Sequence, residues 1–158
     1  MDKEKTKEKK EKTDEELEEL AKEDVVLEAC LEINKVFSGN LEELSKNYAR
    51  VTLEITDKMK LDKLGLAHSG NIFSSASFAA LAAINDPNAI MVSSEVRFLA
   101  PVEVGNIITF EAKAIQSETR KREIEVVGTI LDIKIFEGTF SVAMFDTHVL
   151  KFKIKKVD

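Results

Sequence analysis

The stretch that decides the fold runs from Leu66 to Ala83 and reads LAHSGNIFSSASFAALAA. A His-Ser-Gly-Asn turn at 68–71 leads directly into small and apolar residues, a pattern that predicts one helix of about 14 residues. The first backbone N–H groups of such a helix have no partner within it and would lie beside His68. They polarise a carbonyl group or hold an anion, so the stretch predicts an element of architecture and a binding site together.

On both sides of this helix the apolar residues recur with period two, which predicts strands with one buried face. The alternating positions are Ala49, Val51, Leu53 and Ile55; Val92, Ser94, Val96 and Phe98; Ile108, Phe110, Ala112 and Ala114; Ile124, Val126, Gly128 and Ile130; Phe136, Phe140, Val142 and Met144; and Leu150, Phe152 and Ile154. Turn residues separate these runs at 85–88, 101–106, 116–121 and 146–147. The expected fold class is α+β, with a curved antiparallel sheet of five to six strands wrapped around one long, Ala-rich and therefore narrow helix.

The chain divides into three expected parts. Residues 1–24 carry 7 Lys against 11 Asp and Glu, and this composition is typical of a flexible charged tail. Residues 25–47 are predicted to be a helical segment, because Val26, Ala29, Cys30, Ile33 and Phe37 form one stripe at helical spacing. Ser38-Gly39-Asn40 would end its first helix, and Asn40 with Glu43 would cap one or two further turns. Residues 48–158 are expected to form the globular domain.

Composition excludes several classes of function. The single cysteine rules out a disulfide framework, and no apolar run approaches the roughly 20 residues of a membrane span. With no apolar segment at the Lys- and Glu-rich N-terminus, we expect a cytoplasmic protein without a membrane partner. Of the formal charge of −6, the tail contributes −4, which leaves no basic patch for nucleic acid. His148 has no second ligand at metal-binding spacing, so we expect no metal site.

Two motifs carry a family resemblance. His68-Ser69-Gly70 opens the helix, and the segment from Val96 to Asn106 reads VRFLAPVEVGN. Together they resemble the hotdog-fold acyl-CoA thioesterases of the phenylacetate-pathway type, whose patterns are His-Gly-Gly at the helix start and Phe-Leu-x-Pro-Val-x-x-Gly-Asp between two strands. The resemblance covers about residues 48 to 146.

The resemblance implies a hydrolase of fatty acid metabolism that acts on an acyl thioester of CoA or acyl carrier protein. Coenzyme A would be part of the substrate or ligand, with no further cofactor. The thioester carbonyl would point at the helix start, where Gly70 and Asn71 match the oxyanion site. The family's catalytic carboxylate falls on Ser77, and a serine hydroxyl does not ionise near pH 7 without an adjacent base. Since no acid lies between Asp62 and Asp86, the enzymatic activity stays open.

A second resemblance offers a non-catalytic alternative. The malonyl-CoA-responsive repressor of bacterial fatty-acid synthesis has a hotdog effector domain that also replaces the helix carboxylate with a neutral polar residue. Its strand carries an Arg-Phe pair like Arg97-Phe98, which implies that Arg97 would bind the malonyl carboxylate. An ordinary surface pair of Arg97 with Glu95 or Glu111 is the competing interpretation. The 47 residues before Tyr48 are acidic and too few to form an added DNA-binding domain with its linker.

Further site candidates come with structural alternatives. His68 would line the thioester site or order the turn by hydrogen bonding. Ser74 falls near Asn71 and Ser77 on one helical face, which predicts a neutral polar lining.

The turn residues Arg120, Lys121 and Arg122 would contact the CoA phosphates or form a solvated hairpin. Glu95 would be a displaced catalytic acid or a surface carboxylate.

The expected assembly is a homodimer, with two sheets joined edge to edge and a tetramer or larger assembly built from such dimers. The lysines at 151, 153, 155 and 156 give the last expected strand the charged character of a protected sheet edge.

Overall fold

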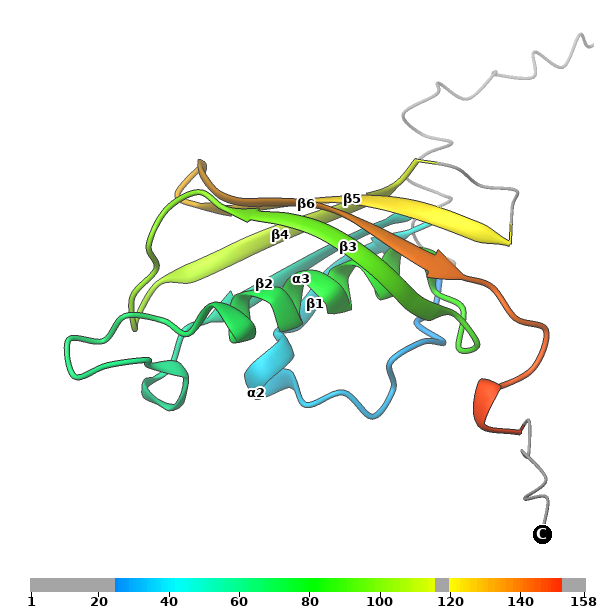
Figure 1. Ribbon diagram of the computed structural model, residues 1–158, viewed down its shortest axis with the longest axis horizontal. Helices are drawn as coiled ribbons and strands as arrows, with labels where there is room; N and C mark the ends of the chain where they lie inside the picture. The colour runs from blue at the N-terminus through cyan, green and yellow to red at the C-terminus, as the bar shows by residue number, and fades with distance from the viewer. Residues whose placement is uncertain (1–24, 116–119, 152–158) are drawn as a thin grey trace, which may run out of the picture.

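One long helix packs against one face of an antiparallel sheet (Figure 1). The computed structural model of the chain describes residues 25–115 and 120–151. The helix, α3, spans Ser69–Ile84, 16 residues, and begins at the turn where the sequence places it. Within the described residues the sheet has six strands, so the predicted α+β hotdog fold is confirmed.

The strand order in the sheet is β1-β2-β4-β5-β6-β3, with every neighbouring pair antiparallel. The strands are β1 (Asn40–Ser45), β2 (Tyr48–Glu54), β3 (Ile90–Phe98), β4 (Ile107–Ala114), β5 (Lys121–Ile130) and β6 (Ile133–Ala143). Three single turns complete the elements: α2 (Lys35–Ser38), η1 (Asp57–Met59) and η2 (Val149–Lys151). The two sheet edges are therefore β1 and β3.

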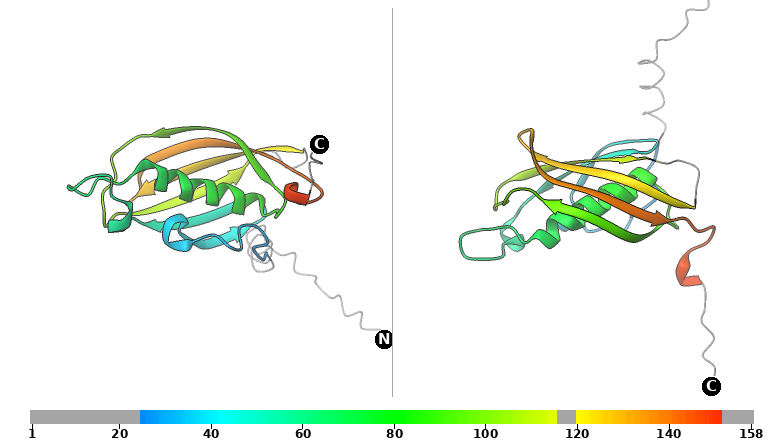
Figure 2. Two further views of the ribbon diagram at one scale, coloured as in Figure 1. Left: turned by 60° about the horizontal axis from the view of Figure 1, so that its bottom comes forward. Right: turned by 45° about the horizontal axis from the view of Figure 1, so that its top comes forward.

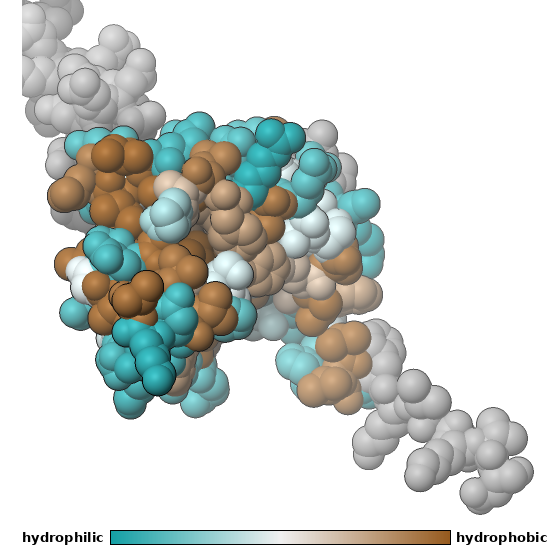
Figure 3. Space-filling model, turned by 60° about the vertical axis from the view of Figure 1, so that its left-hand side comes forward, coloured by the Kyte–Doolittle hydropathy of each residue, from teal (hydrophilic) through white to brown (hydrophobic). Residues whose placement is uncertain are grey.

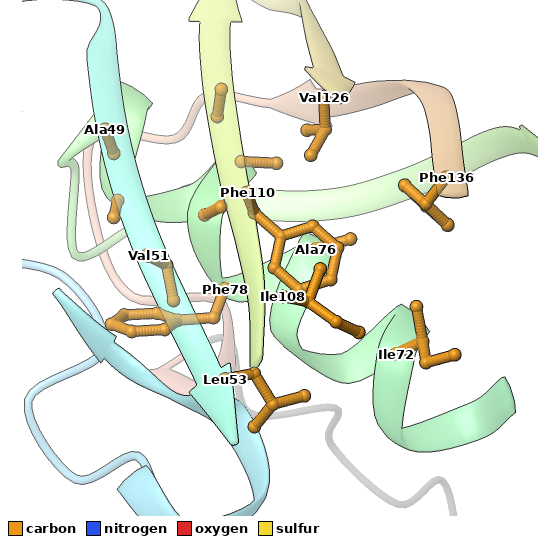
Figure 4. Packing of buried hydrophobic residues seen from close by; sticks show 14 of the residues in the cluster. Ala49, Val51, Leu53, Ile72, Ala76, Phe78, Ile108, Phe110, Val126 and Phe136 are labelled. Atoms are coloured by element: carbon orange, nitrogen blue, oxygen red, sulfur yellow. The ribbon is translucent and has the colours of Figure 1, made fainter. Parts of the chain in front are cut away.

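The core lies between α3 and the inner faces of β2, β4 and β5 (Figure 4). The alternation predicted for β2 is confirmed, since Ala49, Val51 and Leu53 are at most 1% exposed and face the helix. Phe110 and Phe136 fill the centre of the sheet with their rings edge to face, 5.8 Å between centroids. The Ala-rich composition of α3 allows this close approach, because a helix with thin sides packs near the strands.

The segment predicted to be helical before Tyr48 differs from the prediction. Residues 25–34 form no helix, α2 is a single turn, and residues 40–45 form strand β1 of the sheet. Val26 and Phe37, expected on the buried stripe, are 74% and 37% exposed. The positive φ of Cys30, 57°, is incompatible with a continuous helix there. The sheet thus begins at Asn40, eight residues before the expected domain boundary.

We call residues 25–38 the N-terminal strap, because they run along α3 on the side away from the sheet (Figure 2). At the end of the helix, the Asn85 side chain accepts hydrogen bonds from the Glu28 and Ala29 N–H groups at 2.7 and 3.3 Å. It also donates to the Val26 carbonyl oxygen at 2.8 Å. Asn85 has φ 53°, which orients its side chain toward the strap while it ends the helix.

The strap is fixed a second time near the start of α3. The Ser75 hydroxyl donates to the Ser38 carbonyl oxygen at 2.8 Å, and the Ser38 and Ser74 hydroxyls lie 3.1 Å apart. Gly39 then turns the chain into β1 with φ +90°. A Cβ at Gly39 would lie 2.4 Å from the Thr52 carbonyl oxygen, so only glycine fits this close approach.

The ends of the chain depart from the expected strands. Residues 149–151 form the 3₁₀ turn η2 rather than the start of a final strand, and the other residues of that prediction, 152–158, lie outside the described residues. The predicted tail, 1–24, lies outside them as well. The predicted bend between Pro101 and Gly105 is confirmed, with φ +95° at Gly105. No helix in the described part of the chain has the length and apolar character needed to cross a membrane.

Candidate functional site

The start of α3 presents free backbone donors at the surface. Within residues 25–115 and 120–151, the N–H groups of Ser69 and Gly70 have no hydrogen-bond partner. The Asn71 N–H instead donates to the His68 carbonyl oxygen at 3.1 Å and closes the turn. Ser69 and Gly70 are both exposed, so a carbonyl oxygen or an anion can approach them. Of the two donors predicted from the sequence, Gly70 has a free N–H group, whereas the Asn71 N–H is used within the turn.

His68 is the N-cap residue of α3, and its side chain makes no capping hydrogen bond. Its backbone N–H donates to the Met59 carbonyl oxygen at 2.8 Å, which ties the helix start to η1. The imidazole lies over Gly70, because a Cβ built there would be 2.9 Å from His68 Nε2. His68 thus lies beside the free N–H groups rather than ordering the turn through its ring.

Ser77 lies two turns into α3, on the flank of the helix that faces β3. Its hydroxyl donates to the Met91 sulfur at 3.5 Å, a weak acceptor, and both side chains are half-buried. One turn earlier, the Phe73 ring packs on the fully buried Phe140 with 5.6 Å between centroids. We call this side of the helix, from Phe73 to Met91, the β3 flank. Its surroundings are apolar and contain no acid from α3.

The predicted neutral polar face of α3 is divided between two environments. The Ser74 hydroxyl lies 3.1 Å from the Ser38 hydroxyl in the strap, whereas the Ser77 hydroxyl contacts Met91 of β3. Asn71 is half-buried in the first turn of the helix. Ser74 is therefore part of the strap attachment, and Ser77 remains on the side that is open toward β3.

Arg97 and Phe98 lie on opposite faces of the sheet. Phe98 pairs with the buried Phe136 and packs edge to face on its ring, 5.5 Å between centroids, so it shares the inner face with α3. Arg97 pairs with Glu137, and strand alternation turns it to the outer face. Within one chain, Arg97 is thus separated from the helix start where a malonyl thioester would bind.

The outer face of β3, β5 and β6 forms a charged groove with a volume of about 430 Å³. Arg97 lies there among Glu95, Glu125 and Glu137. Glu137 also accepts a salt bridge from Lys134 at 3.3 Å. Glu95 faces this groove rather than α3, so the surface interpretation of both Glu95 and Arg97 fits the geometry better than a role at the helix start.

The three basic residues of the 120–122 turn do not share one surface. Arg120 is exposed and forms an ion pair with Asp146 at 3.3 Å, and Lys121 is exposed beside it. Arg122 is only 8% exposed and donates to the Asn47 side-chain oxygen at 2.6 Å. Burial lowers the pKa of its guanidinium. If CoA phosphates contact this turn, Arg120 and Lys121 are the residues positioned for it.

Sequence reasoning missed the loop that precedes α3. Residues 60–67, here called the leucine loop, expose Leu64 to 93% and Leu61 to 61%. The sequence did contain a signal for this loop, because exposed loops are mostly polar and this one has three leucines in eight residues. In the part of the chain that the structure describes, no group of three or more His, Cys, Asp or Glu side chains is placed to hold a metal ion.

No family model matches the chain. Among solved structures, the chain is 37% identical to Cj0977, a sigma28-regulated virulence protein of Campylobacter jejuni, with a TM-score of 0.77. The match covers 78% of this chain and 88% of that one. It is 33% identical to the uncharacterized protein PH1136 of Pyrococcus horikoshii, with a TM-score of 0.78 over 80% of this chain and 97% of that one.

Curated relatives are longer than the matched region. The chain is 37% identical over 110 residues to the methylthioribose-1-phosphate isomerase of Aquifex aeolicus, which covers 70% of this chain and 24% of the isomerase. It is 25% identical over 105 residues to the transcription factor FapR of Staphylococcus aureus, which covers 66% of this chain and 57% of FapR. The chain therefore spans about a quarter of the first relative and less than two thirds of the second.

More distant structures share the fold. The PaaI protein from the phenylacetic acid degradation operon of E. coli is 19% identical, with a TM-score of 0.63 over 69% of this chain and 85% of that one. A hypothetical thioesterase of Streptococcus pneumoniae, solved with coenzyme A, is 14% identical, with a TM-score of 0.63 over 69% and 87% of the two chains.

Proposed function

Because the chain belongs to the hotdog-fold family that includes Cj0977 and PH1136, we propose that it binds acyl thioesters of CoA or acyl carrier protein at the start of α3. The observation that carries this proposal is the pair of free, exposed N–H groups of Ser69 and Gly70. They are the donors that a thioester carbonyl oxygen needs, and the positive end of the helix dipole strengthens their effect.

The β3 flank supports an apolar acyl group beside this carbonyl. Phe73, Met91 and Phe98 give that side a hydrophobic and partly accessible lining. Aromatic and thioether side chains adapt to flexible chains of methylene groups. The carbonyl would thus lie at the helix start, with its hydrocarbon tail between α3 and β3.

Binding without family-type hydrolysis is the form of the function that the geometry favours. A hydrolase of this type needs a carboxylate that activates water or attacks the carbonyl carbon. Ser77 holds that position and directs its hydroxyl to a thioether, which cannot accept a proton near neutral pH. The Ser77–Met91 contact therefore supplies no base.

Hydrolysis is the second candidate, and one observation favours it. The His68 imidazole lies over Gly70, beside the free N–H groups, and a neutral imidazole is a general base near pH 7. His68 would then remove a proton from the attacking water while Ser69 and Gly70 hold the developing oxyanion. This route predicts thiol release that His68→Gln abolishes.

Titration calorimetry and a thiol-release assay, run on one preparation with a panel of acyl-CoAs, test the proposal. We expect saturable binding without thiol release. Gly70→Ala should weaken binding at least tenfold, because its methyl group displaces the imidazole and obstructs the donors. Gly105→Ala is the matched control, since nothing lies within 4 Å of its Cβ. Absence of binding across the panel would contradict the proposal, and thiol release lost in His68→Gln would replace it with the second candidate.

A malonyl-CoA sensor is the alternative form of a binding module. The curated similarity to FapR supports it, but Arg97 faces the outer groove rather than the helix start. A sensor that uses Arg97 would bind malonyl-CoA more tightly than acetyl-CoA and lose that preference in Arg97→Ala. We expect no such change, because Arg97 is surrounded by carboxylates on the face away from α3.

The functional unit that we propose is a dimer joined at β3. Both edge strands carry an irregularity, between Leu41 and Glu43 in β1 and between Met91 and Ser93 in β3, but β1 has only six residues, and a short edge strand resists pairing. β3 is a nine-residue edge with Val92 53% and Phe98 46% exposed. Antiparallel pairing of two β3 strands would continue the sheet and cover both side chains. Sedimentation velocity should give a dimer, and a monomer at micromolar concentration would contradict this part of the proposal.

A further inference from the structure

Several hydrogen bonds hold the leucine loop although its apolar side chains are exposed. The Asp62 carboxylate accepts hydrogen bonds from the Leu64 and Leu66 N–H groups at 3.0 and 3.2 Å. The Leu61 N–H donates to the Leu66 carbonyl oxygen at 2.6 Å, and the Val104 N–H donates to the Gly65 carbonyl oxygen at 2.9 Å. An ordered loop that holds Leu64 at 93% exposure is typical of a surface that a partner covers.

A hollow with a volume of about 510 Å³ lies between this loop and the bend after β3. Its walls are Leu64, Leu66, Pro101 and Val102, and its polar residues include Asp62 and Glu103. Hydrophobic residues gather on this end of the molecule, next to hydrophilic ones (Figure 3). The hollow therefore suits an apolar side chain that is followed or preceded by a positive charge.

The proposed dimer determines which part of a second copy reaches the hollow. Antiparallel pairing of two β3 strands brings the Phe98 end of one copy to the Ile90 end of the other. The hollow follows Phe98 by only a few residues. At the opposite end, the Asn88 side chain donates to the Asp146 carbonyl oxygen at 3.3 Å, so the segment leading to η2 is attached beside Ile90. In that dimer the η2 turn of one copy would therefore lie near the hollow of the other.

We propose that the η2 turn of a second copy docks in this hollow, with its Leu150 against Leu64 and its Lys151 near Asp62 and Glu103. Leu150 is 82% exposed in the single chain, and Lys151 is exposed beside it. This inference rests on the dimer of the proposed function, and in it Leu64 and Leu150 of the two copies contact each other.

The experiment is a double-mutant cycle on the dissociation constant of the full-length dimer, measured by sedimentation equilibrium. Leu64→Ala and Leu150→Ala should each raise the dimer Kd at least tenfold, because each removes two symmetry-related apolar contacts. The double variant should be no more than threefold weaker than the weaker single variant, since both changes remove the same contact. Leu131→Ala is the matched control, because Leu131 is 91% exposed on the β5–β6 turn and should leave the Kd unchanged.

The outcomes separate this inference from the proposed dimer. A chain that sediments as a monomer overturns both. A dimer whose Kd does not respond to Leu64→Ala or Leu150→Ala overturns the docking alone. Single effects that multiply fully in the double variant also overturn it, because they show that the two leucines act on different contacts. Circular dichroism of each variant should match that of the unmodified chain, as both leucines are exposed in the single copy.

Discussion

The two flanks of α3 differ in how they are closed. On the strap side, Asn85, Ser74 and Ser75 hold residues 25–38 through directional hydrogen bonds at both ends of the helix. On the β3 side, α3 is bridged by a weak hydroxyl–thioether contact and a ring contact at 5.6 Å. The hydrogen bonds of the strap flank need particular side chains in particular orientations. The apolar contacts of the β3 flank are not directional, so they tolerate substitution. We therefore expect changes on the strap flank to act mainly on stability and, under the proposed function, changes on the β3 flank to act mainly on ligand binding.

The largest expected effect is at the turn from strap to β1. Gly39→Ala should lower the free energy of unfolding by about 3 kcal/mol, because the new methyl group meets the Thr52 carbonyl oxygen and φ stays near +90°. Urea denaturation followed by circular dichroism measures it. Gly105 has φ +95° but open space around it, so Gly105→Ala measures the backbone strain without a clash. It should lower the free energy of unfolding by only about 1 kcal/mol. Equal losses in both variants would show that the close approach at Gly39 contributes nothing.

At the other end of the strap, Asn85→Ala should destabilise the chain by about 2 kcal/mol. It removes three hydrogen bonds to strap backbone groups and places alanine in a left-handed conformation. Hydrogen exchange should show the Glu28 and Ala29 amides losing protection before the amides of β2. Asn85→Gly keeps the backbone conformation, so any loss that it shares with Asn85→Ala belongs to the side chain. Unchanged protection of the Glu28 and Ala29 amides would show that the Asn85 side chain does not hold the strap.

On the β3 flank, Phe73→Ala should act more on binding than on folding. We expect a loss of about 1.5 kcal/mol in stability, since the ring is half-buried, and a larger relative loss in acyl-CoA affinity that grows with acyl length. Paired calorimetric titrations with short and long acyl chains measure the difference. Phe78 lies on the same helix and is buried in the core. Phe78→Ala should lower the free energy of unfolding by about 3 kcal/mol, and its effect on affinity should not depend on acyl length. If Phe73→Ala lowers the affinity equally for all acyl lengths, the acyl tail does not lie against Phe73.

The smallest expected effect is at Ser77. Ser77→Ala should change the free energy of unfolding by less than about 0.5 kcal/mol, because a hydroxyl–thioether hydrogen bond is weak. The same urea denaturation is the measurement, with Ser75→Ala as the comparison on the strap flank. Ser75 is fully buried and donates to Ser38, so its loss should be about 1.5 kcal/mol. A Ser77→Ala loss as large as that of Ser75→Ala would show that both flanks are specified alike.

Alternation was sufficient to predict β2, because that strand buries one continuous face, and the run of small and apolar residues was sufficient to predict α3. Strand β1 was missed because a bulge between Leu41 and Glu43 places both Leu41 and Leu44 against the core, three positions apart. That spacing imitates a helix. The strap was missed for a different reason: its backbone N–H groups bind the Asn85 side chain, a partner 57 positions along the chain that no local pattern contains.

The faces on which two of the candidate site residues lie follow from strand alternation. Arg122 has the same parity as Ile124 and Val126, which already places it on the buried face. Arg97 has the opposite parity to Val96 and Phe98, which places it on the outer one. The use of Ser69 rather than Asn71 as a free donor depends on a turn bond to His68, which only coordinates reveal.

The long-range hydrogen bonds of the strap predict an order of events during folding. Its anchors at Val26, Glu28 and Ala29 find their partner only after Asn85 has been synthesised and has closed the end of α3. Contacts across such sequence distances form late, once the sheet and helix have met. We therefore expect the strap to be among the last parts of the chain to fold. A weakened strap would accelerate unfolding and leave the folding rate nearly as it was.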